Sequence, residues 1–141
     1  MKKAFSLVLA LVLCISALTI PVSATVEADF ISPRYINAEN PTVELMISSN
    51  GLATIKSTCR GVSGTTSIKG ITYLQRKVGD SWIRVDIPGA LDQWETSVSG
   101  RIYSVTKTHQ LTIPGTYRAV TIFTVTAGSA ETFTVTAEAT F

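Results

Sequence analysis

Apolar and polar residues alternate with a period of two along much of the chain beyond residue 30. The alternation is clearest over residues 117–126 and 133–139, and 19 threonines occur beyond residue 24. Successive side chains of a β-strand point to opposite faces, and threonine suits a pleated surface, so this pattern predicts half-buried strands. No window keeps the i, i+3, i+4 apolar spacing of an amphipathic helix. We therefore expect an all-β fold.

Turn residues divide the alternating region into five hydrophobic stretches, which is typical of a sandwich or a barrel. We expect the first strand at residues 30–37, at a sheet edge, because Pro33 cannot donate a ladder hydrogen bond. A second strand follows at 43–47, and Asn50-Gly51 predicts a hairpin after it. The rest divides into a loop, a hairpin, an irregular segment and a polar strand: 61–70, 71–77 with 82–87, 88–100 and 102–113.

The buried faces also predict the register of two hairpins. At the first hairpin, a two-residue loop would place Ile47 opposite Thr54, whereas a three-residue loop would place Ile47 opposite Ile55. We favour the second arrangement because it pairs the apolar faces. At the last hairpin, a loop at 127–131 would place Val125 opposite Phe133 and would match both apolar faces.

The first 24 residues have the pattern of a secretion signal. Two lysines precede an apolar run, and small residues close the run at Ala24. We expect cleavage after Ala24, so that the exported chain begins at Thr25 and residues 25–141 form one domain. An uncleaved anchor is one alternative, although a run of about 17 residues is at the short limit for a membrane span. Lipidation of Cys14 is another, disfavoured by the bulky leucine before it.

Removal of the signal changes the charge of the chain. Two lysines leave, so the 12 basic residues become 10 against 10 acidic ones, and the net charge is about zero. There is no basic run or stripe to neutralise a phosphate backbone, so we expect no nucleic-acid partner. We also expect no insertion into a membrane once the signal is removed.

The exported part contains one cysteine, Cys59, and cannot form an internal disulfide. In residues 53–59, Ala53, Ile55 and Cys59 fall on one face of the predicted strand, opposite Lys56. This position favours a buried thiol that acts as a small hydrophobic group. The alternative is a reactive or dimer-forming thiol.

The sequence contains no recognisable catalytic constellation. Its one histidine, His109, lies on a threonine-rich strand, and no Gly-x-Ser-x-Gly turn is present. One cysteine and one histidine cannot make a zinc site, and there is no calcium loop. Asp92 and Glu95 are the one carboxylate pair considered for glycoside hydrolysis, with a solvated loop as the default interpretation. We therefore expect no enzyme activity, no cofactor and no metal.

Large aromatic residues offer the one indication of a binding site. Trp82 opens a predicted strand, and Trp94 lies in the irregular segment. Exposed tryptophans could stack on sugar rings or anchor a protein interface, and Arg84, Arg101 and Arg118 could surround such a site. The competing interpretation is that each tryptophan caps one end of the core.

The segment Leu-Thr-Ile-Pro-Gly-Thr-Tyr-Arg-Ala at residues 111–119 resembles the corner before strand F of immunoglobulin-like sandwiches. The resemblance implies that Gly115 and Tyr117 are structural and that the tyrosine hydroxyl bonds back to the backbone. The chain departs from the antibody pattern in lacking the disulfide and a clear middle-strand tryptophan. Its layout also resembles small secreted proteins of Gram-positive gut bacteria in the motifs Ile-Ser-Pro-Arg-Tyr, Tyr-Leu-Gln-Arg, Gly-Asp-Ser-Trp and Gly-Thr-Tyr-Arg.

The sequence thus predicts a single immunoglobulin-like antiparallel β-sandwich of about seven strands without a disulfide. We expect a secreted, non-catalytic binding, adhesion or structural module that recognises an extracellular protein or glycan, and loose attachment to the cell surface is a variant of this role. One alternative is a small secreted enzyme or inhibitor that uses Cys59 or His109. A second alternative is an envelope or fibre-forming subunit, since a strand at a sheet edge could be exchanged between copies.

Overall fold

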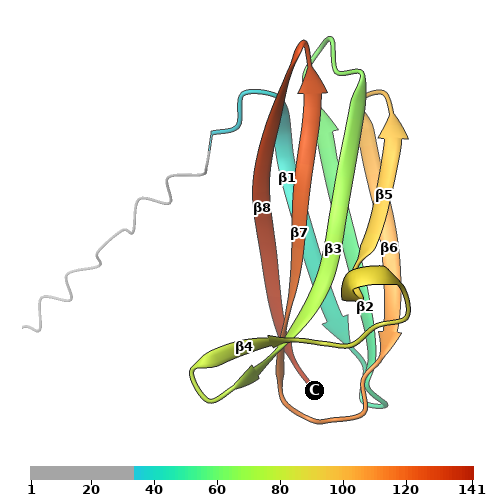
Figure 1. The fold of residues 1–141 in the computed structure, drawn as a ribbon, viewed down its shortest axis with the longest axis vertical. Helices are drawn as coiled ribbons and strands as arrows, with labels where there is room; N and C mark the ends of the chain where they lie inside the picture. The colour runs from blue at the N-terminus through green and yellow to red at the C-terminus, as the bar shows by residue number, and fades with distance from the viewer. Residues whose placement is uncertain (1–33) are drawn as a thin grey trace, which may run out of the picture. The chain divides into compact units, whose positions relative to one another are not determined.

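Strand β3 (Ser67–Val78) is the centre of one of two antiparallel sheets in the computed structural model, which describes residues 34–141 (Figure 1). One edge of β3 pairs with β7 (Thr116–Ala127), which in turn pairs with β8 (Ser129–Thr140). The other edge of β3 is shared by β5 (Trp94–Ser99) and β4 (Ser81–Arg84). This sheet therefore has β8 at one edge and β4 and β5 at the other.

The second sheet has three strands in the order β1 (Ala38–Ile47), β2 (Leu52–Gly61) and β6 (Ile102–Gln110), and it packs against the first (Figure 1). Two facing antiparallel sheets confirm the predicted immunoglobulin-like β-sandwich, with eight strands rather than about seven. Within residues 34–141 there is no disulfide, because Cys59 is free. A short 3-10 segment, Ala90–Asp92, lies between β4 and β5.

Aromatic side chains fill the half of the core near Gly128, the turn between β7 and β8. The ring of Tyr35 lies 4.1 Å from that of Phe133, which lies 5.7 Å from that of Phe123. Tyr103 meets Phe123 edge to face at 5.4 Å. Gly70 makes room for this stack, because a Cβ at that position would lie 2.3 Å from the Tyr103 hydroxyl.

Three buried hydroxyl groups bridge the two sheets at mid-height. Thr121 Oγ1 lies 2.8 Å from Ser57 Oγ and 2.9 Å from Thr72 Oγ1, so the three groups satisfy one another. All three side chains are buried, and a buried hydroxyl without a partner would destabilise the fold. In the described part of the chain, every buried side-chain nitrogen and oxygen has a hydrogen-bond partner.

The prediction of a strand at residues 30–37 is wrong for its described part. Residues 34–37 belong to no strand, and β1 begins only at Ala38. The strand continues through Pro41 because the register shifts between Glu39 and Thr42. Pro41 therefore lies opposite no paired residue of β2, and the ladder requires no N–H donor from it. Pro33, the signal and its cleavage site at Ala24 lie outside the described residues.

Both predicted hairpin registers are wrong by two residues. Ile47 pairs with Ala53 rather than with Ile55, and Phe123 rather than Val125 pairs with Phe133. A shift of two residues keeps the same side chains on the buried face, so the alternation of apolar residues cannot distinguish these registers. The turns decide instead: Gly51, at a φ of 82°, donates its amide hydrogen to the Ser48 carbonyl at 2.9 Å.

Two segment boundaries also differ from the predictions. The loop predicted at 61–70 is shorter, since β3 already begins at Ser67. The segment 88–100 is less irregular than predicted, because it contains β5. The hairpin formed by β3 and β4 and the strand β6 are confirmed. No helix within residues 34–141 has the length and apolar character needed to cross a membrane.

Candidate functional site

The outer face of the five-stranded sheet carries a row of stacked arginine and aromatic side chains, here called the Arg–aromatic row: Tyr73, Trp82, Arg84 and Arg118. The guanidinium carbon of Arg84 lies 3.7 Å from the ring centroid of Tyr73. That of Arg118 lies 4.3 Å from the ring of Trp82. The first stack connects diagonal neighbours on the adjacent strands β4 and β3. The second reaches across β3, from β7 to β4, a span that two long side chains can cover.

Alternation along β3 explains why the row faces outward. Thr72 and Leu74 are buried between the sheets, so Tyr73 and Gln75 point to the opposite side. Gln75 pairs with Arg84 on β4 and with Arg118 on β7, which carries their side chains to the same side. The row covers Val120, which lies opposite Tyr73 and is only 3% exposed despite facing outward.

Hydrogen bonds fix both guanidinium groups. Arg118 donates from Nε and Nη2 to Oε1 of Gln75, at 3.0 and 2.6 Å. Arg84 donates from Nη1 to the Leu91 carbonyl at 3.0 Å and to Gln93 Oε1 at 3.4 Å. Each arginine is therefore held in place before any partner arrives, which lowers the entropy cost of binding.

The charges of the row are not neutralised within the described part of the chain. The two ion pairs found there join Lys69 to Glu95 at 2.6 Å and Arg60 to Glu39 at 3.6 Å. Neither Arg84 nor Arg118 has a carboxylate within 4.0 Å among residues 34–141. Because the guanidinium groups cover one face of each ring, the row fits a partner with acidic and planar groups better than a stacked sugar ring.

The two tryptophans, each expected either to bind a partner or to cap the core, do not lie together. Trp94 pairs with Thr72, whose side chain is buried, and packs against the hydrophobic core. Trp82 and Arg84 lie on the opposite face of the same sheet. Of the two further arginines predicted to surround a site, Arg118 belongs to the row, whereas Arg101 donates from Nε to the Gly61 carbonyl at 3.1 Å.

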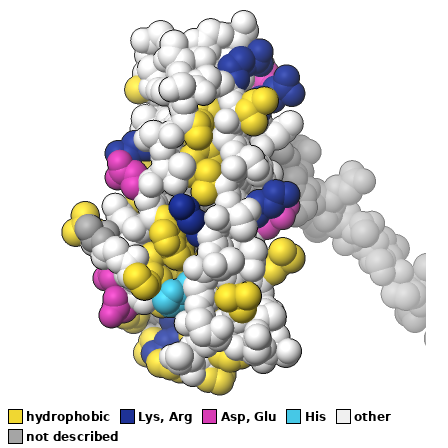
Figure 2. All heavy atoms as spheres, turned by 90° about the vertical axis from the view of Figure 1, so that its right-hand side faces the viewer, with side chains coloured by type: hydrophobic (Ala, Val, Ile, Leu, Met, Phe, Trp, Pro, Cys, Tyr) yellow, Lys and Arg dark blue, Asp and Glu magenta, His cyan; other side chains and the backbone are white. Residues whose placement is uncertain are grey.

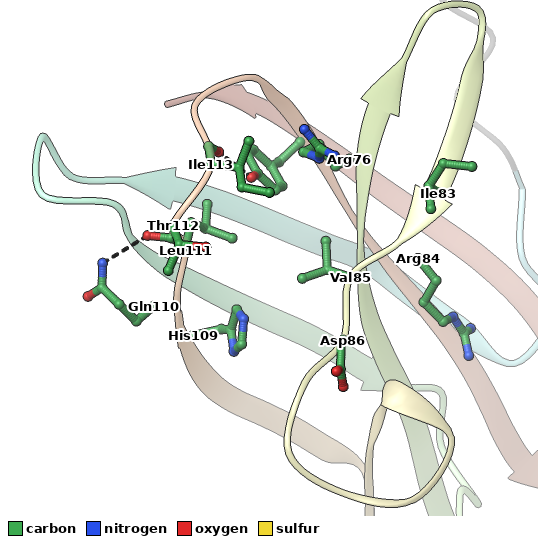
Figure 3. Close-up of a pocket in the computed structure, with 11 residues that line it drawn as sticks. Arg76, Ile83, Arg84, Val85, Asp86, His109, Gln110, Leu111, Thr112 and Ile113 are labelled. Carbon is green, nitrogen blue, oxygen red and sulfur yellow. Dashed lines mark hydrogen bonds between the residues drawn. The ribbon is translucent and has the colours of Figure 1, made fainter.

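His109 lines a separate cleft of about 270 Å³ between the end of β6 and the segment after β4 (Figure 3). It pairs with Ala53, a fully buried position, so its side chain faces the interior rather than the outer surface. Figure 2 shows the side of the molecule where β5 and β6 approach; apolar side chains are visible along the seam, and the histidine lies in its lower half. The ring is half-buried.

Cys59 is buried, with 3% of its surface exposed, as the alternation predicts. Burial, with a smaller contribution from the charge of Glu131, raises the pKa of the Cys59 thiol to about 11. The thiol is therefore protonated at neutral pH, and nucleophilic chemistry needs the thiolate. These observations argue against the alternative of a reactive thiol.

Tyr117 and Gly115 form the corner that leads into β7. The Tyr117 hydroxyl donates a hydrogen bond to the carbonyl of Ile113, four residues earlier, as the immunoglobulin-like resemblance implies. Burial raises the pKa of Tyr117, and the nearby charge of Arg76 acts in the opposite direction. Gly115 has a φ of 153° and exchanges two backbone hydrogen bonds with Phe141. Both residues therefore shape the turn.

The two carboxylates considered for glycoside hydrolysis, Asp92 and Glu95, lie in different surroundings. Glu95 forms its ion pair with Lys69 on the outer face, and Asp92 ends the short 3-10 segment. No group of three or more His, Cys, Asp or Glu side chains that could hold a metal ion occurs among the described residues.

Sequence reasoning missed Tyr73 and Gln75. Both lie on the outward face of a strand that the sequence predicted. Gln75 pairs with Arg84 and with Arg118, so all of these side chains share that face. An outward tyrosine flanked across the sheet by arginines was therefore a usable signal, but only with the strand order known.

Comparison with known proteins gives a structural likeness alone. No family model matches the chain, and no curated protein matches it. Among solved structures, it is similar to the CARDB domain of a Pyrococcus furiosus protein crystallised in complex with di-metal ions. The identity is 17%, the TM-score is 0.45, and the match covers 77% of this chain and 91% of that domain. At this level the likeness carries no argument about function.

Proposed function

We propose that the protein is an exported, non-catalytic binding module that contacts an extracellular protein through the Arg–aromatic row. The observation that carries the proposal is the pair of stacked, hydrogen-bonded guanidinium groups that have no carboxylate partner in the described chain. Tryptophan, tyrosine and arginine are the residue types that dominate binding energy at protein interfaces. The partner surface would present acidic groups to the two arginines, and a glycan is the other partner class.

Site-specific photo-crosslinking tests the proposed face and identifies the partner in the same experiment. Benzoylphenylalanine replaces Lys77, which is exposed and lies 6.0 Å from the Trp82 ring, so the row itself stays intact. The matched control carries the same group at Met46, which is 61% exposed on the outer face of the three-stranded sheet. Cultures of the producing cells are irradiated, and adducts are identified by mass spectrometry.

We expect a protein adduct from position 77 and none from position 46. Adding Arg118→Gln to the position-77 variant should reduce the adduct about tenfold, as expected for the loss of an interface residue worth more than 1 kcal/mol. Equal adducts from both positions, no adduct, or an adduct indifferent to Arg118→Gln would each contradict the proposed face. A glycan adduct from position 77 alone would keep the face and change the partner class.

Cell fractionation with intact-mass analysis tests export. A released species that begins at Thr25 supports the secreted module. A species that keeps the signal, or is lipid-modified at Cys14, would instead support an envelope protein whose partners lie on the same surface. This test and the crosslinking test are independent, because a cell-bound protein could still use the same face.

A further inference from the structure

We infer that the cleft at the end of β6 is a second binding site, and that it takes a carboxylate carried on a short apolar stem. The cleft, of about 270 Å³, lies between the segment that follows β4 and the connector from β6 to β7 (Figure 3). It is smaller than the usual range of small-molecule pockets, so it would hold a terminal group rather than a large ligand.

One part of the cleft wall is aliphatic. Val85 and Leu111 contribute to it, and Ile83 and Ile113 line it although they are 52% and 48% exposed. Exposed aliphatic side chains that converge on one concave surface differ from isolated ones, because together they gain from excluding water. An apolar stem would cover them.

The other part of the wall carries positive charge. Arg76 is half-buried, and its stem lies beside Gly115, where an added Cβ would come within 3.9 Å of Arg76 Cγ and Cδ. Among residues 34–141, Arg76 has neither a carboxylate within 4.0 Å nor a side-chain hydrogen bond. Its five N–H donors match a carboxylate in a bidentate geometry. His109 adds two ring nitrogens, and Asp86 is the one acidic residue in the lining.

The combination of an unused guanidinium with an aliphatic wall identifies the ligand chemistry. A phosphate or sulfate would use the charge and leave the wall exposed, whereas a hydrocarbon would leave the guanidinium without a partner. Both a free carboxylic acid and the C-terminus of a peptide ending in an aliphatic residue carry the required groups. Arg84 also borders the cleft, but its guanidinium is committed to Tyr73 and Leu91.

NMR titration of the purified protein tests the site, with isocaproate and N-acetyl-alanyl-leucine as probes and their amides as neutral controls. We expect saturable shifts of the methyl signals of Val85, Leu111 and Ile113, and binding of the amides at least tenfold weaker. Arg76→Gln should weaken binding of the acids about tenfold, and Arg76→Lys should restore part of it. Arg60→Gln is the matched control, because Arg60 is exposed and pairs with Glu39 elsewhere.

The relative affinities identify the source of the carboxylate. Tighter binding of the peptide acid indicates a protein C-terminus, and tighter binding of isocaproate indicates a free acid. Equal binding of acids and amides, loss of binding in Arg60→Gln as large as in Arg76→Gln, or the absence of saturable shifts would overturn the inference. None of these results depends on the Arg–aromatic row, so the two proposals can fail separately.

Discussion

The strands β8 and β6 lie at the edges of opposite sheets, and they direct very different side chains toward the interior. On β8 the inward positions after Glu131 are all apolar: Phe133, Val135, Ala137 and Ala139. On β6 the inward row begins apolar and then becomes polar: Tyr103, Val105, Lys107 and His109. The β8 side packs closely against β1 and residues 34–37, whereas the β6 side opens into the cleft at its polar end.

The two sides also use their charged groups differently. On the β8 side, Glu131 accepts hydrogen bonds from the backbone amides of Ile36 and Asn37, at 3.1 and 2.6 Å. On the β6 side, Arg76 has no ion-pair partner within the described chain. A polar group satisfied inside the fold stabilises it, whereas an unsatisfied one is available to a ligand. The β8 side therefore contributes stability, whereas the polar end of β6 borders a cleft that contains a guanidinium group unpaired within residues 34–141.

Phe133→Ala should cause the largest loss of stability. Phe133 contacts both Tyr35 and Phe123, so its removal leaves a cavity on the closed side of the sandwich. We expect the free energy of unfolding to fall by about 3 kcal/mol, at the low end for phenylalanine because the ring is only half-buried. Urea denaturation measures this, and Phe133→Leu should recover more than half of the loss. A change below 1 kcal/mol would mean that the β8 side is not closed by packing.

Alkaline pH should destabilise the protein through Cys59. The pKa of the thiol is about 11 in the fold against 9.0 unperturbed, so the folded state holds the proton more tightly. Stability from this group is complete below pH 9 and is lost as pH rises to 11, by about 2 to 3 kcal/mol. Burial also raises the pKa of Tyr103 and Tyr117, which add to the loss above pH 10.

Urea titrations at pH 8 and pH 10 measure the effect. The Cys59→Ala variant is the control, since it should lose most of the pH dependence in this window while being less stable at both values. If the stability of Cys59→Ala depended on pH as strongly as that of the wild type, the thiol would not have the raised pKa.

Glu131→Gln should cost about 1 to 2 kcal/mol. The amide keeps the shape of the carboxylate but weakens two charge-assisted hydrogen bonds to the backbone. Glu138→Gln on the exposed face of β8 is the matched control and should change stability by less than about 0.5 kcal/mol. Equal losses of stability from the two variants would show that the hydrogen bonds of Glu131 do not stabilise the β8 side.

Arg118→Gln should have a smaller effect on stability than on binding. It removes one cation–π stack and two hydrogen bonds to Gln75 at a partly exposed site, which together contribute about 1 kcal/mol. Thermal unfolding measures this change. A loss above about 3 kcal/mol would show that the row mainly stabilises the sheet.

The comparison of edge strands also explains which features the sequence could predict. The β-sandwich and the burial of Cys59 followed from period-two alternation, because a strand on a closed side has to bury every second residue. The hairpin registers did not follow, because a slip of two residues leaves the buried set unchanged. Strand β5 was missed because its sequence, Trp-Glu-Thr-Ser-Val-Ser, is mostly polar at a partly open edge.

The candidate sites were predictable only in fragments. Trp82, Arg84 and Arg118 could be identified as possible contacts from residue type. Their convergence on Tyr73 and Gln75 depends on β3 lying between β4 and β7, and local sequence does not contain that order. For Trp94 the sequence left both a binding role and a place at the end of the core open, because strand β5, which turns it toward the core, was not recognised.

One matched pair of substitutions tests most directly whether the two sides differ as described. Val135→Gln places an amide at an inward position of β8, and His109→Gln places the same amide at an inward position of β6. The free energy of unfolding should fall by about 2 kcal/mol or more for Val135→Gln, because a polar group enters the packed side. His109→Gln should change it by less than about 0.5 kcal/mol. Equal losses from the two variants would show that the polar end of β6 is packed as tightly as the inward face of β8, and would contradict the account.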